Sequence, residues 1–141
     1  MIRLAREEDI DDILPHLRQQ ELETIAQLRL NVRALVRSAI GPYAFSGLVG
    51  DRVACMWGLR LTTLAGGHPP IWLLTTPLIE QRRMEFLRVS RAFIKGAVAE
   101  FGPVVAMCDV RNEVSLGWLK WLGFKPFRLE GSYLGMVCDG N

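Results

Sequence analysis

The sequence predicts a mixed α/β fold in a single domain, and three observations lead to this prediction. Apolar stretches typical of strands alternate along the chain with amphipathic stretches typical of helices. One apolar run, Val104–Cys108, is continuous, as in strands that are covered on both faces. A chain of 141 residues can bury a sizeable core but is too short for two ordinary domains, so residues 1–141 are predicted to form one domain.

The N-terminal third is predicted to form one strand and two helices. Residues 2–5 begin as an alternating strand, and the five acidic residues that follow suit the positive end of a helix. The apolar side chains of this helix share one face as far as Leu17, with a kink or restart at Pro15, because proline cannot donate a backbone hydrogen bond. A second helix is expected from about Glu21 to Ala39, where apolar residues recur at helical spacing.

Basic residues form a row along this second predicted helix. Arg29, Arg33 and Arg37 recur every four residues, which places them on one helix face. Such a row is most often a solvated face. The alternative is a site for an acidic substrate or partner.

The middle of the chain is predicted to form a hairpin, a third strand and the longest helix. Gly50-Asp51 is a two-residue turn signal between strands at residues 43–49 and 52–63. Residues 71–76 are predicted to form the next strand, which a proline ends. The helix at residues 82–101 then carries aromatic and small apolar side chains at helical intervals.

The C-terminal part is predicted to form a short helix and a closing hairpin after the Val104 strand. Asn112 is expected to cap the helix, because its short amide side chain can accept the free backbone N–H groups of the first turn. Gly123 supplies the left-handed residue that ends the helix. Strands at residues 125–130 and 133–138 are then expected to pair antiparallel.

The predicted order of elements is therefore βααβββαβαββ. A right-handed crossover through the helix at residues 82–101 makes the strands at 71–76 and 104–108 a central parallel pair. In such sheets, ligands bind beyond the C-terminal ends of the parallel strands. The mouth of a site is therefore expected near Thr75, Thr76, Asp109 and Asn112.

Composition and charge exclude several classes of function. The net charge is only +2 and the basic residues are scattered, so no nucleic-acid partner is expected. Residues 61–79 carry no charge, but glycines and prolines in the middle of this stretch exclude a membrane span, and no membrane partner is expected. The first twelve residues mix two arginines with five acids and have no apolar run, so a signal peptide is not expected.

The cysteines and histidines do not predict a metal site. Cys55, Cys108 and Cys138 lie in apolar strand-like segments without close spacing, so they are predicted to be buried thiols in a reducing compartment rather than a disulfide framework. His16 and His68 have no cysteine or acid at ligand spacing, so no metal is expected.

The segment from the Val104 strand to Phe124 resembles part of a known protein family. An apolar strand, Asn112, a helix and Leu122-Gly123-Phe124 follow one another as in the last conserved segment of the GNAT superfamily, the acetyl-CoA-dependent N-acetyltransferases. A narrower likeness is to the GNAT-like proteins of tailed phages, including podophage internal virion proteins. It lies in residues 16–23, 70–76, 82–91 and 112–124, and the resemblance covers nearly the whole chain.

This resemblance implies a GNAT-like acyl-CoA N-acyltransferase fold and a site for acetyl-CoA. In that family the first parallel strand offers unpaired backbone groups to the pantetheine arm, and the matching positions here are Leu74 and Thr75. A glycine-containing loop then holds the pyrophosphate through backbone N–H groups. Arg83 and Glu85 occupy the glycine positions here, and the charge of Glu85 would repel a phosphate, so an anion is expected to bind through the side chains of Arg82 and Arg83 instead. The alternative is that these residues form an ordinary charged first turn of the helix.

The family's catalytic groups are only partly present. Leu119 occupies the place, seven residues after Asn112, where many family members carry a tyrosine that protonates the leaving thiolate. Asn112 is included among the expected cofactor contacts. Asp109 is the nearest candidate base, although turn-capping is the commoner role of such an aspartate. Tyr133 of the closing hairpin is a further candidate catalytic residue, and nothing in the sequence selects it over Tyr43. Cys108 is expected to be a structural thiol, since no histidine is placed to activate it.

Three functions follow from this resemblance. The leading one is a GNAT-superfamily protein of phage or prophage type with degenerate transfer equipment, which uses acetyl-CoA to acetylate an unknown amine. The alternative is a non-catalytic virion or assembly protein that binds protein partners, and the third is a sensor of a CoA-type ligand. The expected partners are accordingly a CoA-type small molecule or virion proteins, and a homo-oligomer is compatible with the sequence. The expected location is the host cytoplasm, or the virion interior for a phage structural protein.

Overall fold

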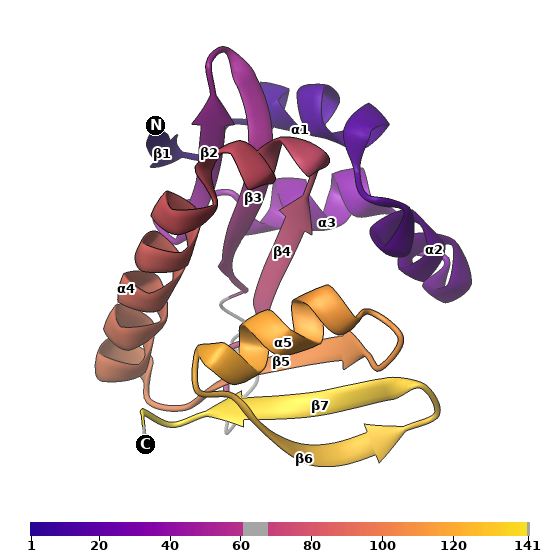
Figure 1. Cartoon of the computed structure of the whole chain (residues 1–141), viewed down its shortest axis with the longest axis vertical. Coiled ribbons are helices and arrows are strands. Elements are labelled where there is room, and N and C mark those ends of the chain that lie inside the picture. The colour runs from indigo at the N-terminus through magenta and orange to yellow at the C-terminus, as the bar shows by residue number, and fades with distance from the viewer. Residues whose placement is uncertain (61–67, 141) are drawn as a thin grey trace. The chain divides into compact units, whose positions relative to one another are not determined.

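Two β-sheets organise the computed structural model, which describes residues 1–60 and 68–140 (Figure 1). The first sheet has the strand order β1-β2-β3-β4 and the second the order β5-β7-β6. The chain divides into two compact units, the first formed by Met1–Arg60 with Trp72–Phe86 and the second by Leu61–Ile71 with Leu87–Asn141. The predicted mixed α/β fold class is confirmed.

The first sheet contains the predicted hairpin. Its strands are β1 (Ile2–Leu4), β2 (Ala44–Val49), β3 (Arg52–Leu59) and β4 (Ile71–Thr75). β2 pairs antiparallel with both β1 and β3. Gly50 in the β2–β3 turn has a φ of 61°, which glycine adopts without steric cost. β3 is buried at every position after Arg52, which explains its continuous apolar sequence. The predicted extension of β3 beyond residue 60 lies outside the described residues.

Short helices belong to the same unit as this sheet. They are α1 (Glu7–Ile13), the 3₁₀ helix η1 (Leu14–His16), α2 (Gln19–Leu28) and α3 (Val32–Ala39). The restart at Pro15 is confirmed, because α1 ends before it and η1 contains it. A core cluster of buried residues joins these helices to the sheet; it consists of Ala5, Ile10, Ile13, Leu17, Val36, Ala44, Val53 and Met56.

The prediction of one helix from Glu21 to Ala39 is wrong, because two helices occupy this stretch. Arg29 ends α2 in a left-handed conformation with a φ of 52°, and its N–H donates to the carbonyl of Ala26 at 3.3 Å. Asn31 then caps α3 by accepting the Ala34 N–H at 3.1 Å. The apolar periodicity continued across the break and concealed it, whereas the asparagine was the available signal of a new helix start.

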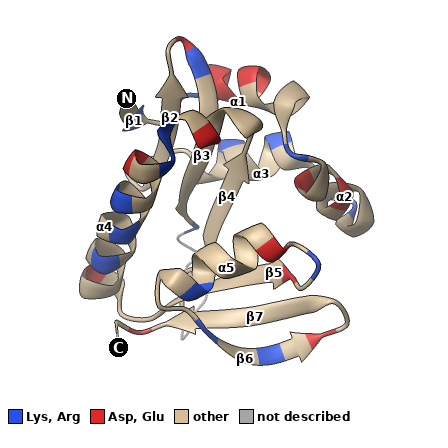
Figure 2. Cartoon of the chain, viewed as in Figure 1, with Lys and Arg blue, Asp and Glu red and all other residues tan. Residues whose placement is uncertain are grey.

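The predicted basic row is therefore not continuous. Arg33 forms an ion pair with Asp11, and Arg37 forms one with Glu7 at 2.7 Å, so two of the three arginines bind acids of α1. Figure 2 shows the corresponding red segments of α1 and blue segments of α3. Arg29 belongs to a different helix and has no side-chain ion pair within the described parts of the chain.

The second unit contains most of the longest helix and the C-terminal hairpin. Its elements are α4 (Arg83–Phe101, from Leu87 onward), β5 (Val104–Asp109), α5 (Glu113–Trp121), β6 (Lys125–Glu130) and β7 (Tyr133–Cys138). The predicted cap is confirmed, because Asn112 accepts the Ser115 N–H at 3.2 Å. Gly123 has a φ of 101°, as predicted for the helix end. β7 pairs antiparallel with both β6 and β5.

The predicted parallel arrangement is present as a single bridge. Pro70 and Val105 form an isolated parallel bridge, and the Val105 N–H donates to the carbonyl of Pro69 at 3.1 Å. β4, which starts directly after this bridge, is hydrogen-bonded to β3 in the first sheet, whereas β5 is hydrogen-bonded to β7 in the second. The bridge therefore joins the chain just ahead of β4 to the start of β5.

The indoles of α5 pack against α4 in the second unit. Trp118 Nε1 donates to the buried Ser90 Oγ at 3.2 Å, and the Arg91 guanidinium lies 3.9 Å from the centre of the Trp121 ring. Phe124 is buried, as predicted for this aromatic cluster, but Trp121 is 43% exposed. The arginine covers one face of that indole.

The predicted burial of the three cysteines is confirmed, and all three thiols are free. Within the described residues, no helix combines the length and apolar character that crossing a membrane requires. No group of three or more histidine, cysteine or acidic side chains that could hold a metal ion occurs in the same residues.

Candidate functional site

A glutamate of α2 is bound to the end of β4 in the first unit. Glu21 Oε1 and Oε2 each accept the Thr75 N–H at 2.9 Å, and Oε1 accepts the Thr75 hydroxyl at 2.8 Å. The carbonyl of Thr75 accepts the N–H of Arg18 at 3.2 Å. Because Arg18 is the N-cap residue of α2, the first turn of this helix places the glutamate against the strand.

Burial changes the acid–base properties of this glutamate. Removal from water raises the pKa of the Glu21 carboxyl from 4.5 to about 7, and this effect outweighs the opposing hydrogen bonds from Thr75 and the charge of Arg18. Both protonation states of the carboxyl are therefore populated near neutral pH. A carboxyl group with such a pKa is suited to accept a proton from a substrate.

The backbone groups of Leu74 and Thr75, which were predicted to bind the coenzyme, face other parts of the first unit. The Thr76 N–H donates to the carbonyl of Ala54 on β3 at 2.9 Å, so alternation along the strand directs the backbone of Leu74 toward β3 as well. Thr75 and Leu73 direct their backbone groups to the opposite edge. Glu21 and Arg18 occupy both groups of Thr75, so a ligand chain that pairs with this residue must displace them.

The predicted phosphate-binding segment is helical. Residues Pro77–Arg82 form the 3₁₀ helix η2, and Arg83 begins α4 with a φ of −54° and a ψ of −47°. The two positions that hold glycine in the resembling family, Arg83 and Glu85, therefore lie in ordinary helical turns, which do not form a backbone cradle. Arg82 and Arg83 are exposed, and the described residues provide no ion-pair partner for either side chain.

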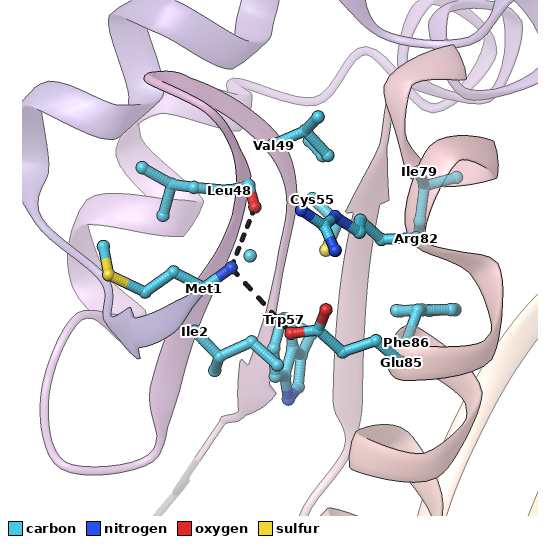
Figure 3. Close-up of a pocket in the computed structure, with 12 residues that line it drawn as sticks. Met1, Ile2, Leu48, Val49, Cys55, Trp57, Ile79, Arg82, Glu85 and Phe86 are labelled. Atoms are coloured by element: carbon cyan, nitrogen blue, oxygen red, sulfur yellow. Dashed lines mark hydrogen bonds and ion pairs between the residues drawn. The ribbon is translucent and has the colours of Figure 1, made fainter.

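A small pocket lies next to this segment in the first unit (Figure 3). Arg82 and Glu85 of η2 and α4 line it together with Cys55, and its volume is about 30 Å³. Its lining is mostly apolar, and the Met1 amino group donates to the carbonyl of Leu48 at 3.1 Å beside it. This volume holds no more than a few water molecules, so the pocket does not accommodate a coenzyme.

The other predicted site residues lie together at one end of the second sheet. Asp109 of β5 and Tyr133 of β7 are direct cross-strand partners, and the Asn112 N–H donates to the carbonyl of Asp109 at 2.9 Å. The Asp109 carboxylate accepts the Arg111 N–H at 2.9 Å and the Arg111 guanidinium at 2.6 Å, and these bonds hold its pKa below the ordinary value. This geometry favours the turn-capping role of Asp109.

Two neighbouring residues also have structural roles. The side-chain oxygen of Asn112 caps α5, so this oxygen already has a hydrogen-bond partner. Burial, with a further contribution from Asp109, raises the pKa of the Cys108 thiol to about 11. The thiol is therefore protonated at neutral pH, in agreement with the structural role expected for it.

Glu21 is the functional candidate that the sequence reading missed. An Arg-x-x-Glu pattern at a helix start was a weak local signal, since acidic residues are common in the first turn. The partner of the glutamate lies 54 residues further along the chain. Neither its contact with β4 nor its burial could be derived from spacing.

Comparison with known proteins identifies the fold. No protein-family model matches the sequence, and no curated protein matches it either. Solved structures do match over nearly their whole length. A GNAT-family acetyltransferase from Streptococcus agalactiae superimposes with a TM-score of 0.65 at 15% identity, covering 100% of this chain and 95% of that one. The PaiA N-acetyltransferase from Thermoplasma acidophilum, in complex with coenzyme A, gives 0.67 at 13% identity, covering 99% and 98%.

A third structure agrees with these two. An acetyltransferase from Bacillus subtilis in complex with CoA has a TM-score of 0.62 at 12% identity, and the alignment covers 98% of this chain and 97% of that one. At such low identity the comparison establishes the fold alone. The chain therefore has the GNAT-like fold that the sequence resemblance implied.

Proposed function

We propose that this chain is an N-acetyltransferase of GNAT type that uses acetyl-CoA to acetylate an amine. The observation that carries the proposal is the full-length match of its fold to acetyltransferase structures, two of which contain coenzyme A. The proposal that the protein is of phage or prophage type rests on the sequence resemblance in residues 16–23, 70–76, 82–91 and 112–124.

The residues present fit a phosphate-bearing coenzyme through side chains rather than through a glycine loop. Arg82 and Arg83 lie where η2 meets α4. Neither guanidinium group has an ion-pair partner among the residues that the structure describes. Two acids lie near these arginines. Glu80 is bound to Arg18 at 2.8 Å and Glu85 lies 3.8 Å from the Met1 amino group, and both contacts reduce the repulsion of an anion. Arginine binds phosphate oxygens in a planar, bidentate geometry, so these two side chains are the proposed phosphate contacts.

Glu21 is the proposed proton acceptor. A bound acetyl-CoA supplies an acetyl group that is activated for attack by an amine. The amine must lose a proton during the transfer, and Glu21 is a carboxyl group at the end of β4 with a pKa raised by burial to about 7. Asp109 is less suited to this step because Arg111 lowers its pKa. Tyr133 of the closing hairpin, in the second unit, is a candidate from the sequence alone.

Titration calorimetry with CoA and acetyl-CoA tests the proposal. The doubly substituted variant Arg82→Ala/Arg83→Ala should weaken binding at least about tenfold, because it removes both charge-assisted contacts. Arg88→Ala, which removes an exposed arginine further along α4, is the matched control and should bind like the wild type. Release of CoA from acetyl-CoA should then be measured with a panel of amines. Absence of binding at millimolar coenzyme would refute the enzymatic proposal.

A second candidate function is a non-catalytic phage virion or assembly protein that uses this fold to bind protein partners. The observation that favours it is the closed edge of β4, where Glu21 and Arg18 already occupy the backbone of Thr75. Co-purification with phage particles, together with absence of coenzyme binding, would support this candidate. The corresponding locations are the virion interior for the assembly protein and the host cytoplasm for the enzyme.

A further inference from the structure

An open groove in the first unit is lined mainly by aliphatic side chains. Its volume is about 490 Å³, and it is widely open to solvent. Its apolar lining comes from η1, α2, α3 and the connections on either side of α2, and consists of Leu14, Leu17, Leu22, Ile25, Leu30 and Val32. Leu22 is 40% exposed and Leu30 is 39% exposed, so the structure leaves apolar surface uncovered here.

Two of the three polar side chains that line the groove already have partners, and Arg29 is the third. The Asn31 side chain caps α3, and Arg33 is neutralised by its ion pair with Asp11. Arg29 also lines the groove, but its guanidinium has no hydrogen bond or ion pair to any part of the chain that the structure describes. The groove therefore combines an aliphatic surface with one uncompensated positive charge.

The backbone fixes the position of this arginine. Arg29 is the one residue other than glycine with a positive φ among the described residues, and it occupies the left-handed position that ends α2. Glycine is the residue that adopts this conformation without strain. The end of α2 thus holds a long cationic side chain at the groove, at a position where glycine would be more stable.

We propose that this groove binds a small apolar carboxylate, whose hydrocarbon part lies on the leucines and whose carboxylate pairs with Arg29. The charge of Arg29 complements an anion, and the aliphatic lining complements a chain or ring without polar groups. This site is separate from the proposed acetyl transfer, and its test needs neither coenzyme nor turnover.

Octanoate is a suitable probe, and its binding should be followed by NMR of the groove methyl groups of Leu22, Ile25 and Val32. The expected result is saturable binding of octanoate. Acetate, which lacks the hydrocarbon chain, and octylammonium, which has the opposite charge, should each bind at least about tenfold more weakly. Equal binding of octanoate and octylammonium, or no saturable octanoate binding at millimolar concentration, overturns the proposal.

A substitution at Arg29 separates a loss of binding from a loss of folding. Arg29→Gly removes the charge and suits the left-handed backbone, so it should keep or raise the melting temperature while it weakens octanoate binding about tenfold. Arg29→Lys keeps the charge but loses the planar two-point geometry, so its octanoate affinity should fall less than that of Arg29→Gly. Arg88→Ala serves as the control for a general loss of positive charge. Wild-type affinity in Arg29→Gly would overturn the assignment of this residue.

Discussion

Replacing Glu21 by glutamine should change how the stability of the protein depends on pH. In the folded state, burial raises the pKa of this carboxyl from 4.5 to about 7. The folded protein therefore binds more protons than the unfolded chain between these values, and the free energy of unfolding falls as pH rises through this window. Each pKa unit of this shift corresponds to about 1.4 kcal/mol, so the raised pKa lowers the free energy of unfolding above pH 7 by about 3 kcal/mol. This is an upper bound, because solvent reaches part of the Glu21 side chain.

Glu21→Gln removes this charge but leaves an amide oxygen that can accept the Thr75 N–H. The wild type should lose stability between pH 4.5 and 7.5, whereas the variant should show a flatter profile and be relatively more stable at the upper end. Urea unfolding at four pH values across this range measures the difference. Glu23→Gln, at an exposed position of the same helix, is the control and should keep the wild-type slope. Identical slopes for wild type and Glu21→Gln would refute the reasoning.

Four further substitutions test a helix cap, the packing at two glycines and a buried carboxylate. Asn112→Ala should cost about 1 kcal/mol of stability in thermal or urea unfolding, because it removes the cap of α5; an unchanged midpoint would contradict this role. Gly58→Ala should lower the free energy of unfolding by at least about 2 kcal/mol, because the new Cβ would lie 2.4 Å from the carbonyl oxygen of Tyr43. Gly96→Ala on α4 should raise the free energy of unfolding by about 0.5–1 kcal/mol, because its new Cβ meets nothing within 4 Å and alanine favours a helix. Asp9→Asn should cost about 2 kcal/mol, because this buried carboxylate binds an arginine and a buried serine hydroxyl; urea unfolding with no loss would contradict that.

Elements marked by local signals could be predicted from the sequence. The turn at Gly50, the cap at Asn112 and the stop at Gly123 depend on the chemistry of one or two residues, and the structure has all three. The break at Arg29 was missed because the apolar periodicity of α2 and α3 continues across it. An arginine in the left-handed conformation also gives no warning of a helix end, unlike a glycine.

The candidate site was less predictable because its interactions are long-range. Asp109 and Asn112 could be located at a strand end, but the pairing of Asp109 with Arg111, which lowers its pKa, depends on side-chain conformation. Glu21 was not predicted as a site residue for a similar reason. Its raised pKa depends on contact with a strand far along the chain and on the water that this contact excludes.

The buried thiols make the protein suitable for chemical footprinting of its opening motions. Cys55 lies in the first unit, with a pKa raised by burial to about 12, and Cys108 lies in the second with a value of about 11. Alkylating reagents attack only the thiolate, so neither cysteine should be labelled at neutral pH until its surroundings open. Mass spectrometry after a timed pulse of iodoacetamide would therefore report separately how often each half of the chain exposes its interior.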